Sequence, residues 1–337
     1  MQTLKSTSRA RILLAIFSAS ALAALNKTGS TCTVTPLATG ADDTPQILDA
    51  FKQCGRDGKV VLTEGLFNIG QVMRTTDLNN CDIEIHGTLK WSSDIQYWLR
   101  NSISVTYAGR STAWQLGGVN ISLRGFGKAL FDGNGQLWYD QNRNQGNQNG
   151  RPISLTLCMK GNSSNVHVSN VVCHESGAMC IGSIGSNPSQ ADIVENVYYD
   201  NVTAYHSSNA AWIKTYSGQG RVRNVTFANM RFDNVNQPIY ITPCIYGSSG
   251  CDSSRLSIED IRWVNITGTS RYNVAAGIHC SAAAPCKNLS MENVNITPMK
   301  GGTAKWLCSN IQNQQSSGIP CTESCPANWP QQLDGDR

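Results

Sequence analysis

The sequence predicts an all-β protein folded as a single-stranded parallel β-helix. A unit recurs through the C-terminal half at intervals of 28 to 33 residues, and inside each unit apolar and polar residues alternate. Alternation with a period of two is typical of strands, whereas the only useful helical pattern is a short one over 43–54. Repeated strands at this spacing require a coil whose turns stack on one another.

The repeat is marked by a polar–apolar pair that occurs twice in each unit, five residues apart. The units begin at Asn165, Asn196, Asn224, Arg255 and Asn288, with successive separations of 31, 28, 31 and 33 residues. A β-propeller blade needs about 40 residues or more, and the leucine pattern of leucine-rich repeats is absent. In a parallel β-helix, recurrent asparagines at the bends can stack as hydrogen-bonded ladders, so most of these asparagines have a structural explanation.

The remaining elements follow in order along the chain. The short helix over 43–54 is expected to cap one open end of the coil. The segments 80–92 and 119–134 predict further strands with glycine-rich bends, and the polar segment 136–151 predicts a long loop. The tail over 308–337 contains three cysteines and three prolines and predicts an irregular cap.

The first residues predict a secretory signal peptide over 1–23, followed by one domain over 24–337. Lys5, Arg9 and Arg11 precede an apolar run with small residues, which is the usual order in such a leader. A membrane anchor is the alternative, but the run is shorter than the roughly 20 residues that a membrane-spanning helix needs. Removal of these three charges lowers the formal net charge from +4 to +1, so the overall charge predicts neither nucleic-acid nor membrane binding.

The cysteines and sequons agree with secretion. Thirteen cysteines predict disulfides with at least one thiol left over, and the absence of CxxC pairs argues against zinc. Eight Asn-x-Ser/Thr sequons predict a glycosylated surface: Asn26, Asn120, Asn162, Asn201, Asn224, Asn265, Asn288 and Asn295.

Several segments, in order, resemble glycoside hydrolase family 28, the polygalacturonases, and most closely its fungal exo-acting galacturan 1,4-alpha-galacturonidase branch. They are 41–45, 131–139, 151–153, 173–185, 211–216 and 236–246, and they cover nearly the whole chain after the leader. The resemblance implies a right-handed, pectin lyase-like β-helix. It also implies removal of galacturonate from the non-reducing end of homogalacturonan, with inversion and without a cofactor or metal. We expect a secreted monomer whose partner is a pectic polysaccharide.

The carboxylates that the family uses are missing from this chain. Inverting hydrolysis needs one carboxylic acid for the leaving oxygen and one carboxylate for the attacking water. The family supplies three aspartates from an Asn-Thr-Asp segment and an Asp-Asp pair one turn later, but no aspartate lies between Leu157 and Asp192. The only Asp-Asp pair here is Asp42-Asp43, far from the expected turns. Roughly two turns, on the order of 60 residues, are predicted to be absent between Leu157 and Cys158.

The resemblance assigns roles to four other residues. His174 is the candidate catalytic residue, although the position of the family's histidine holds Gly177, and an ordinary bend histidine is the alternative. Lys214 matches the lysine that binds the substrate carboxylate. Trp212 replaces the family's arginine and either stacks on a sugar or packs inside a turn, and Tyr246 lies near a substrate-side tyrosine.

Two further points concern charge and disulfides. Glu175 is considered as a substitute acid, and Arg221 and Arg223 as sources of positive potential along a groove, with ordinary surface charges as the alternative. By resemblance Cys158 pairs with Cys173. The further candidate pairs are Cys32 with Cys54, Cys244 with Cys251, and Cys280 with Cys286, although spacing alone does not fix connectivity.

Three functions compete on this evidence. The matched segments favour an exo-polygalacturonase. The missing aspartates favour an inactive, pectin-binding or truncated relative. A pectate lyase shares the predicted fold, but the clustered calcium-binding carboxylates that it requires are not seen in the sequence.

Overall fold

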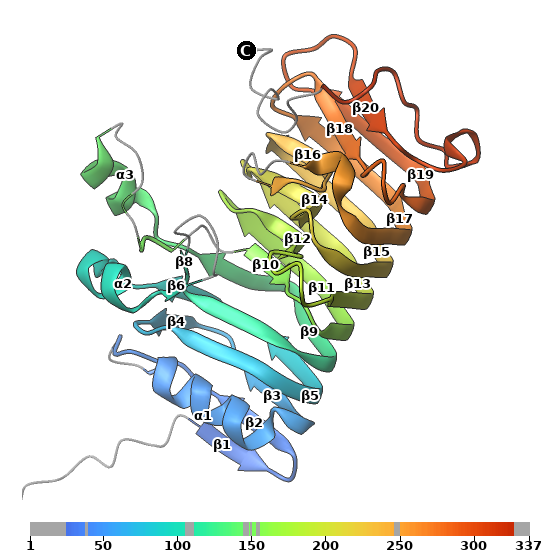
Figure 1. The fold of residues 1–337 in the computed structure, drawn as a ribbon. Coiled ribbons are helices and arrows are strands. Elements are labelled where there is room, and N and C mark those ends of the chain that lie inside the picture. The colour runs from blue at the N-terminus through green and yellow to red at the C-terminus, as the bar shows by residue number, and fades with distance from the viewer. Residues whose placement is uncertain are drawn as a thin grey trace, which may run out of the picture.

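The computed structural model describes residues 25–37, 40–104, 111–143, 148, 150–152, 156–245 and 250–326, except for the side chains of Thr156 and Leu157. The chain winds into a parallel β-helix that rises from β1 to β20 (Figure 1). The predicted fold is therefore confirmed. The predicted leader over 1–23 lies outside the described residues, and no described helix is long and apolar enough to cross a membrane.

One sheet runs the length of the coil, in the order β1-β2-β3-β5-β9-β11-β13-β15-β17-β19, with β4 and β6 beside this path. Only β1 and β2 pair antiparallel in it. Its strands are β1 (Leu25–Thr28), β2 (Thr31–Val34), β3 (Arg56–Leu62), β4 (Leu66–Ile69), β5 (Met73–Ile85), β6 (Thr88–Trp91), β9 (Trp114–Asp132), β11 (Ser163–His174), β13 (Asp192–Tyr205), β15 (Gln219–Val235), β17 (Arg255–Ser270) and β19 (Lys287–Pro298).

A second sheet of six parallel strands forms another side of the coil, but only in its C-terminal part. Its order is β10-β12-β14-β16-β18-β20, with β10 (Thr156–Met159), β12 (Ala178–Ile184), β14 (Asn209–Thr215), β16 (Gln237–Thr242), β18 (Val274–His279) and β20 (Lys305–Ser309). A short antiparallel pair, β7 (Ile103–Ser104) and β8 (Ser111–Thr112), completes the described strands.

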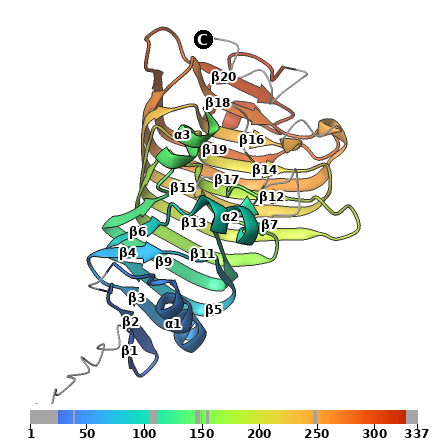
Figure 2. The ribbon, with the colours of Figure 1, turned by 90° about the vertical axis from the view of Figure 1, so that its left-hand side faces the viewer.

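The three α-helices of the described residues stand on the same side of the coil (Figure 2). The helix α1 (Thr44–Cys54) occupies almost the range expected from the sequence. Two were not expected: α2 (Ile95–Asn101), whose first turn is capped by Asp94, and α3 (Gln136–Asn142), which lies in the segment predicted to be a loop. Two short 3-10 turns, η2 (Cys251–Ser253) and η3 (Gln314–Ser316), lie near the C-terminal end.

The core consists of side chains stacked from turn to turn. Tyr199, Phe227 and Trp263 occupy the same register position in β13, β15 and β17, and their rings stack at 5.1 and 6.3 Å. The Tyr199 hydroxyl donates to the carbonyl of Cys180 at 3.0 Å, which ties this sheet to the second one. The inward positions of the alternating strands thus form the apolar core expected from the sequence.

The turn before the expected deletion pairs directly with the turn after it. β9 and β11 are parallel neighbours over most of their length, with Ile121 opposite Val166 and Phe131 opposite Cys173. The register shifts once, where residues 125–128 bulge out of β9 between Arg124 and Ala129. A β-bulge of this kind absorbs extra residues without ending the pairing.

Five disulfides are present among the described residues. Cys32–Cys54, Cys244–Cys251 and Cys280–Cys286 are the three further pairs considered from the sequence, and Cys308–Cys321 pins the tail. The expected pairing of Cys158 with Cys173 is wrong, because Cys158 bonds Cys180. The register of β10 and β12 places Cys158 directly opposite Cys180, whereas Cys173 is buried on β11 in the other sheet.

Candidate functional site

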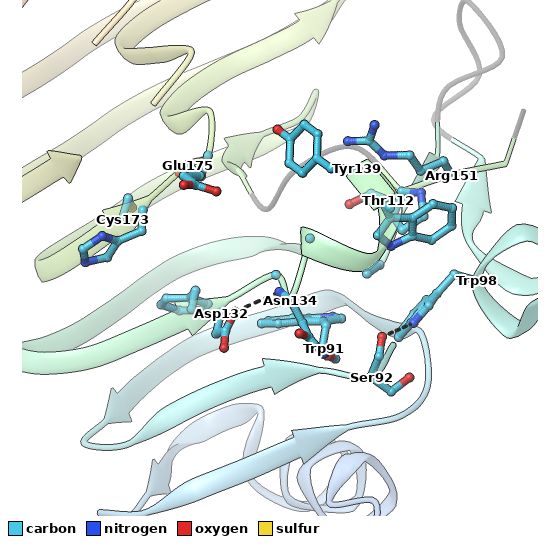
Figure 3. A pocket seen from close by; sticks show the side chains of 18 of the residues that line it. Trp91, Ser92, Trp98, Thr112, Asp132, Asn134, Tyr139, Arg151, Cys173 and Glu175 are labelled. Carbon is cyan, nitrogen blue, oxygen red and sulfur yellow. Dashed lines mark hydrogen bonds between the residues drawn. The ribbon is translucent and has the colours of Figure 1, made fainter. Parts of the chain in front are cut away.

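A cavity of about 380 Å³ lies where α2 and α3 meet the ends of β6, β9 and β11 (Figure 3). Among the described residues, the turns before β10 contribute no strand to the second sheet, and α2 and α3 border the cavity instead. The cavity is therefore built from segments that are far apart in sequence and adjacent in the stack.

Aromatic side chains form one part of the lining, and we call Trp91, Trp98, Trp138 and Tyr139 the aromatic wall. The three tryptophans are nearly buried, and the Trp98 indole is fixed by donating its N–H to the carbonyl of Ser92 at 2.8 Å. Trp91 stacks on Phe131 at 6.3 Å. Tyr139 is 64% exposed at the rim. Flat apolar rings of this kind pack against ring-shaped ligands and leave polar edges available for hydrogen bonds.

Asp132 and His174 lie on adjacent turns, because Phe131 pairs with Cys173 one position earlier. The Asp132 carboxylate accepts a hydrogen bond from the backbone N–H of Asn134 at 2.8 Å, and it lies 4.0 Å from the Lys90 ammonium. The His174 ring stacks on Tyr205 with centroids 4.8 Å apart. Neighbouring turns thus bring an acid and an imidazole to the same cavity.

Glu175 supplies a second carboxylate. It follows β11 in the left-handed backbone region, with φ of 48°, and its N–H donates to the carbonyl of Tyr205 at 2.9 Å. That conformation is uncommon for a residue with a side chain, and the hydrogen bond to the next turn holds it there. Figure 3 shows Glu175 and Arg151 on different sides of the cavity.

Arg151 is the guanidinium of the site, and it lies 5.9 Å over the Trp138 ring. A guanidinium is planar, always charged and stacks on aromatic faces, and its geometry matches that of a carboxylate. The described lining therefore contains one guanidinium, two carboxylates, one imidazole and five Trp, Tyr or Phe side chains, the fifth being Phe131. No cluster of three His, Cys, Asp or Glu side chains suited to a metal occurs in the described part of the chain.

Cys173 also lines the cavity but is a poor candidate for chemistry. Burial raises the pKa of its thiol to about 12. A thiol with so high a pKa stays protonated near neutral pH and is not a nucleophile. The aspartate, the glutamate and the histidine are thus the groups suited to proton transfer here.

Comparison with known proteins identifies the family. Residues 153–318 match the profile described as "Glycosyl hydrolases family 28". The chain is 30% identical over 422 residues to "Putative galacturan 1,4-alpha-galacturonidase A" from Aspergillus niger, with 90% of this chain and 95% of that protein covered. The chain belongs to glycoside hydrolase family 28.

The chain is also similar to proteins with other names. The chain is 30% identical over 388 residues to "Exopolygalacturonase" from Cochliobolus carbonum, covering 87% of this chain and 86% of that one. It is 27% identical to "Alpha-L-rhamnosidase rgxB" from Aspergillus niger, covering 83% and 87%. The crystal structure of endo-xylogalacturonan hydrolase from Aspergillus tubingensis gives a TM-score of 0.49 at 25% identity, covering 87% of this chain and 99% of that one.

The alignment with the Aspergillus niger galacturan 1,4-alpha-galacturonidase A is longer than this chain. Ninety per cent of 337 residues is about 303, so about 119 of its 422 aligned positions contain no residue of this chain. The relative therefore contains residues, within the aligned range, that have no counterpart here.

The family 28 residues expected from the sequence do not all gather at the cavity. His174 and Glu175 line it. Lys214 and Trp212 lie instead on the outer face of the second sheet, where Lys214 is 1% exposed. The Lys214 ammonium sits 3.9 Å over the Trp212 ring, and the Trp212 indole donates to the carbonyl of Gly177 at 3.0 Å.

That outer face is covered by apolar packing. Cys180, Trp212, Tyr240, Ile245 and Leu307 form a buried cluster over the strands of the second sheet. Trp212 is buried in this cluster, on the face of the sheet that points away from the main core. The substrate roles of Trp212 and Lys214 stay predictions, and Tyr246 lies outside the described residues.

Arg221 and Arg223 lie away from the cavity and both face Glu195. Their guanidinium groups approach the Glu195 carboxylate at 2.7 and 3.8 Å. These contacts match the surface-charge alternative rather than a groove of free positive potential.

Sequence reasoning missed several cavity residues. Asp132, Tyr139 and Arg151 all lie in segments that resemble the family, yet none was singled out. Trp91 and Trp98 lie in segments that showed no motif. Asp132 could have been predicted from its position in the segment 131–139, which resembles the family. The sequence offered no sign of the aromatic wall beyond the abundance of tryptophan.

Proposed function

We propose that this chain binds the non-reducing end of a galacturonate-containing pectic polysaccharide in the cavity beside α2 and α3. The observation that carries this proposal is the combination of the aromatic wall with Arg151 in one cavity. Two relatives at 30% identity are named for exo-acting or galacturonidase activity, which supports recognition of a chain end.

The chemistry of the cavity suits a uronic acid. An indole or phenol ring can pack against the apolar face of a sugar. The Arg151 guanidinium can bind the sugar carboxylate through two parallel hydrogen bonds. Asp132, His174 and Glu175 then offer acceptors and donors for the hydroxyl groups.

Hydrolysis at the family's rate is not expected of this chain. The segments that carry the family's aspartates have no match here, and the long alignment to the relative supports an internal gap. Loss of a single general acid or base costs about 10²- to 10⁴-fold in rate. Without either group, binding is what remains of the family's function.

A second candidate function is hydrolysis by a substitute pair. The observation that favours it is that Asp132 and Glu175, two carboxylates from adjacent turns, line the same cavity. Inverting and retaining mechanisms both need such a pair on opposite sides of the glycosidic bond.

We further propose that the protein works outside the cell. The five disulfides are typical of an oxidising compartment, and the sequence predicts a leader over 1–23. A pectic polymer would be encountered there.

Binding is tested by isothermal titration calorimetry with trigalacturonate. Arg151→Gln should weaken binding by about tenfold or more, since a hydrogen-bonded ion pair is lost. The matched control is Arg56→Gln, because Arg56 is exposed at the start of β3, does not line the cavity and lies 3.3 Å from the Asp77 carboxylate. Equal affinity in both variants contradicts the assignment.

Recognition of the chain end has its own control. Trigalacturonate whose non-reducing sugar carries a 4,5 double bond should bind more weakly than the saturated trimer, because the terminal ring changes shape. Tighter binding of a rhamnose-terminated oligomer would contradict galacturonate as the ligand. Release of galacturonate that disappears in Asp132→Asn and in Glu175→Gln would establish the second candidate.

A further inference from the structure

The eight sequons are alike in sequence and in exposure. All eight asparagines are exposed in the structure, so access to the surface does not sort them. They differ in what their side-chain amides do.

Five of the sequon asparagines use the amide nitrogen in a ladder between turns. The bonds are Asn120 to Asn80 at 2.7 Å, Asn201 to Asn170 at 2.6 Å, Asn224 to Asn196 at 2.8 Å, Asn265 to Asn229 at 3.1 Å and Asn288 to Asp260 at 3.0 Å. In each, Nδ2 donates to a side-chain oxygen of the preceding turn. All five have φ between 50° and 56°, the left-handed bend conformation that aligns the ladder.

The other three sequon asparagines lie outside these ladders. Asn26 lies in β1, Asn162 lies in the bend between β10 and β11, and Asn295 lies in β19 opposite Thr267. Within the described residues, their side-chain amides make no hydrogen bond.

The amide nitrogen is the atom that N-glycosylation modifies. The transfer forms a bond between Nδ2 and the first carbon of the sugar, breaks the bond from that carbon to the diphosphate of a lipid-linked donor, and releases an amide proton. In a ladder residue this nitrogen lies 2.6 to 3.1 Å from the preceding turn. A sugar on it must therefore fit between strands spaced about 4.8 Å apart.

We propose that Asn26, Asn162 and Asn295 carry the N-linked glycans of the folded protein, and that the five ladder sequons are unmodified. Transfer occurs on the extended chain, before the turns stack, so the fold does not block the transferase. The fold instead selects among modified chains afterwards. A chain modified at a ladder residue loses stacking contacts between turns, so it is depleted from the secreted protein.

The test expresses the full chain in a secreting yeast. Enzymatic removal of glycans in heavy-oxygen water converts each modified asparagine to a labelled aspartate, which peptide mass spectrometry locates. Label is expected at Asn26, Asn162 and Asn295. Label at any ladder sequon, or none at these three, overturns the proposal.

A matched pair of substitutions checks the result without touching any asparagine. Thr297→Ala removes the sequon of Asn295, and Thr267→Ala removes that of Asn265; both threonines are exposed on neighbouring strands. Thr297→Ala should lower the mass of the secreted protein by one glycan, and Thr267→Ala should leave it unchanged. The opposite pattern overturns the assignment even if both variants fold equally well.

Discussion

Asp43 is a fully buried carboxylate just before α1. It accepts hydrogen bonds from the backbone N–H groups of Leu37 and Asn68 at 2.8 and 2.7 Å and from the Gln46 amide at 2.7 Å. Its neighbour Asp42 binds the N–H groups of Thr44 and Gly70. The only Asp-Asp pair in the chain is thus a clamp that holds α1 against the first turns.

Replacing Asp43 by alanine should destabilise the protein by about 3 kcal/mol. Three donors lose their acceptor, and a buried donor without a partner costs about 1–3 kcal/mol. The control is Asp49→Ala on the exposed side of α1, where the carboxylate accepts a hydrogen bond from the Gln53 amide and the loss should stay within about 0.5 kcal/mol. Urea unfolding at neutral pH measures both, and equal losses would refute the clamp.

His279 provides a prediction about pH. Burial lowers the pKa of its imidazole despite the Asp252 carboxylate 3.7 Å away. Below about pH 6.5, His279 therefore binds a proton more readily in the unfolded chain than in the folded chain. Its contribution to the free energy of unfolding is complete above that pH and is lost on acidification. The slope is at most about 1.4 kcal/mol per pH unit for one histidine.

His279→Gln should therefore flatten the loss of stability between pH 6.5 and 5.5. Burial lowers the pKa of His167 as well, so some slope should remain. Ser309→Ala, a change at the register position opposite His279, should shift stability equally at both pH values because serine does not titrate. A His279→Gln slope as steep as that of the unmodified protein would show that His279 does not control it.

At the scale of elements, the asparagine ladders hold the bends in register. Asn229 donates to the Asp200 carboxylate at 2.6 Å and accepts from Asn265 at 3.1 Å, with φ of 53°. It therefore meets two demands at once: a left-handed backbone and a polar side chain aligned with both neighbouring turns.

Two substitutions at Asn229 separate these demands. Asn229→Ala should cost about 3 kcal/mol, since it loses two hydrogen bonds and strains the left-handed backbone. Asn229→Gly should cost about 2 kcal/mol, since glycine adopts positive φ without strain. If thermal or urea unfolding gives equal losses for both, the backbone conformation contributes nothing measurable.

Elements differ in how far the sequence predicts them. The strands from β9 to β19 are long, alternate clearly and repeat, so their pattern is visible over several turns. The helices α2 and α3 contain seven residues each, too few to show a helical period. Asp94 at the start of α2 was the available signal, because its side chain caps the N–H of Tyr97.

At the scale of the whole molecule, the coil is supported unevenly. β15 is paired along its length by β13 and β17, and its turn also places β14 between β12 and β16. β3 is flanked by β2 and β5, but no described strand of its turn belongs to the second sheet. In a solenoid each turn is stabilised mainly by its neighbours, so local stability should follow this difference.

Native-state hydrogen exchange should detect the difference. The amides of Val225 and Phe227 should exchange only through global unfolding, whereas those of Val60 and Leu62 should exchange through a partial opening of lower free energy. Mass spectrometry of exchanged peptides across a range of urea concentrations measures both. Identical free energies for the two strands would show that the coil opens as a single unit.

The candidate site was less predictable than the fold, for a physical reason. Repeats predict which residues point inward, because each turn contacts only the next. The cavity instead depends on how α2 and α3 fold back over β6, β9 and β11, which no periodic pattern records. His174 and Glu175 were found through the family resemblance, whereas Trp98 needed the structure.

The direct pairing of β9 with β11 has a consequence for how such proteins change over generations. Secretory quality control retains chains that expose apolar surface, but a coil in which β9 pairs directly with β11 keeps its core buried. A protein whose gene has lost complete turns would therefore not be retained, and it would be secreted. In this architecture natural selection must detect such a loss through the growth of the organism, since the cell's folding machinery has nothing to reject.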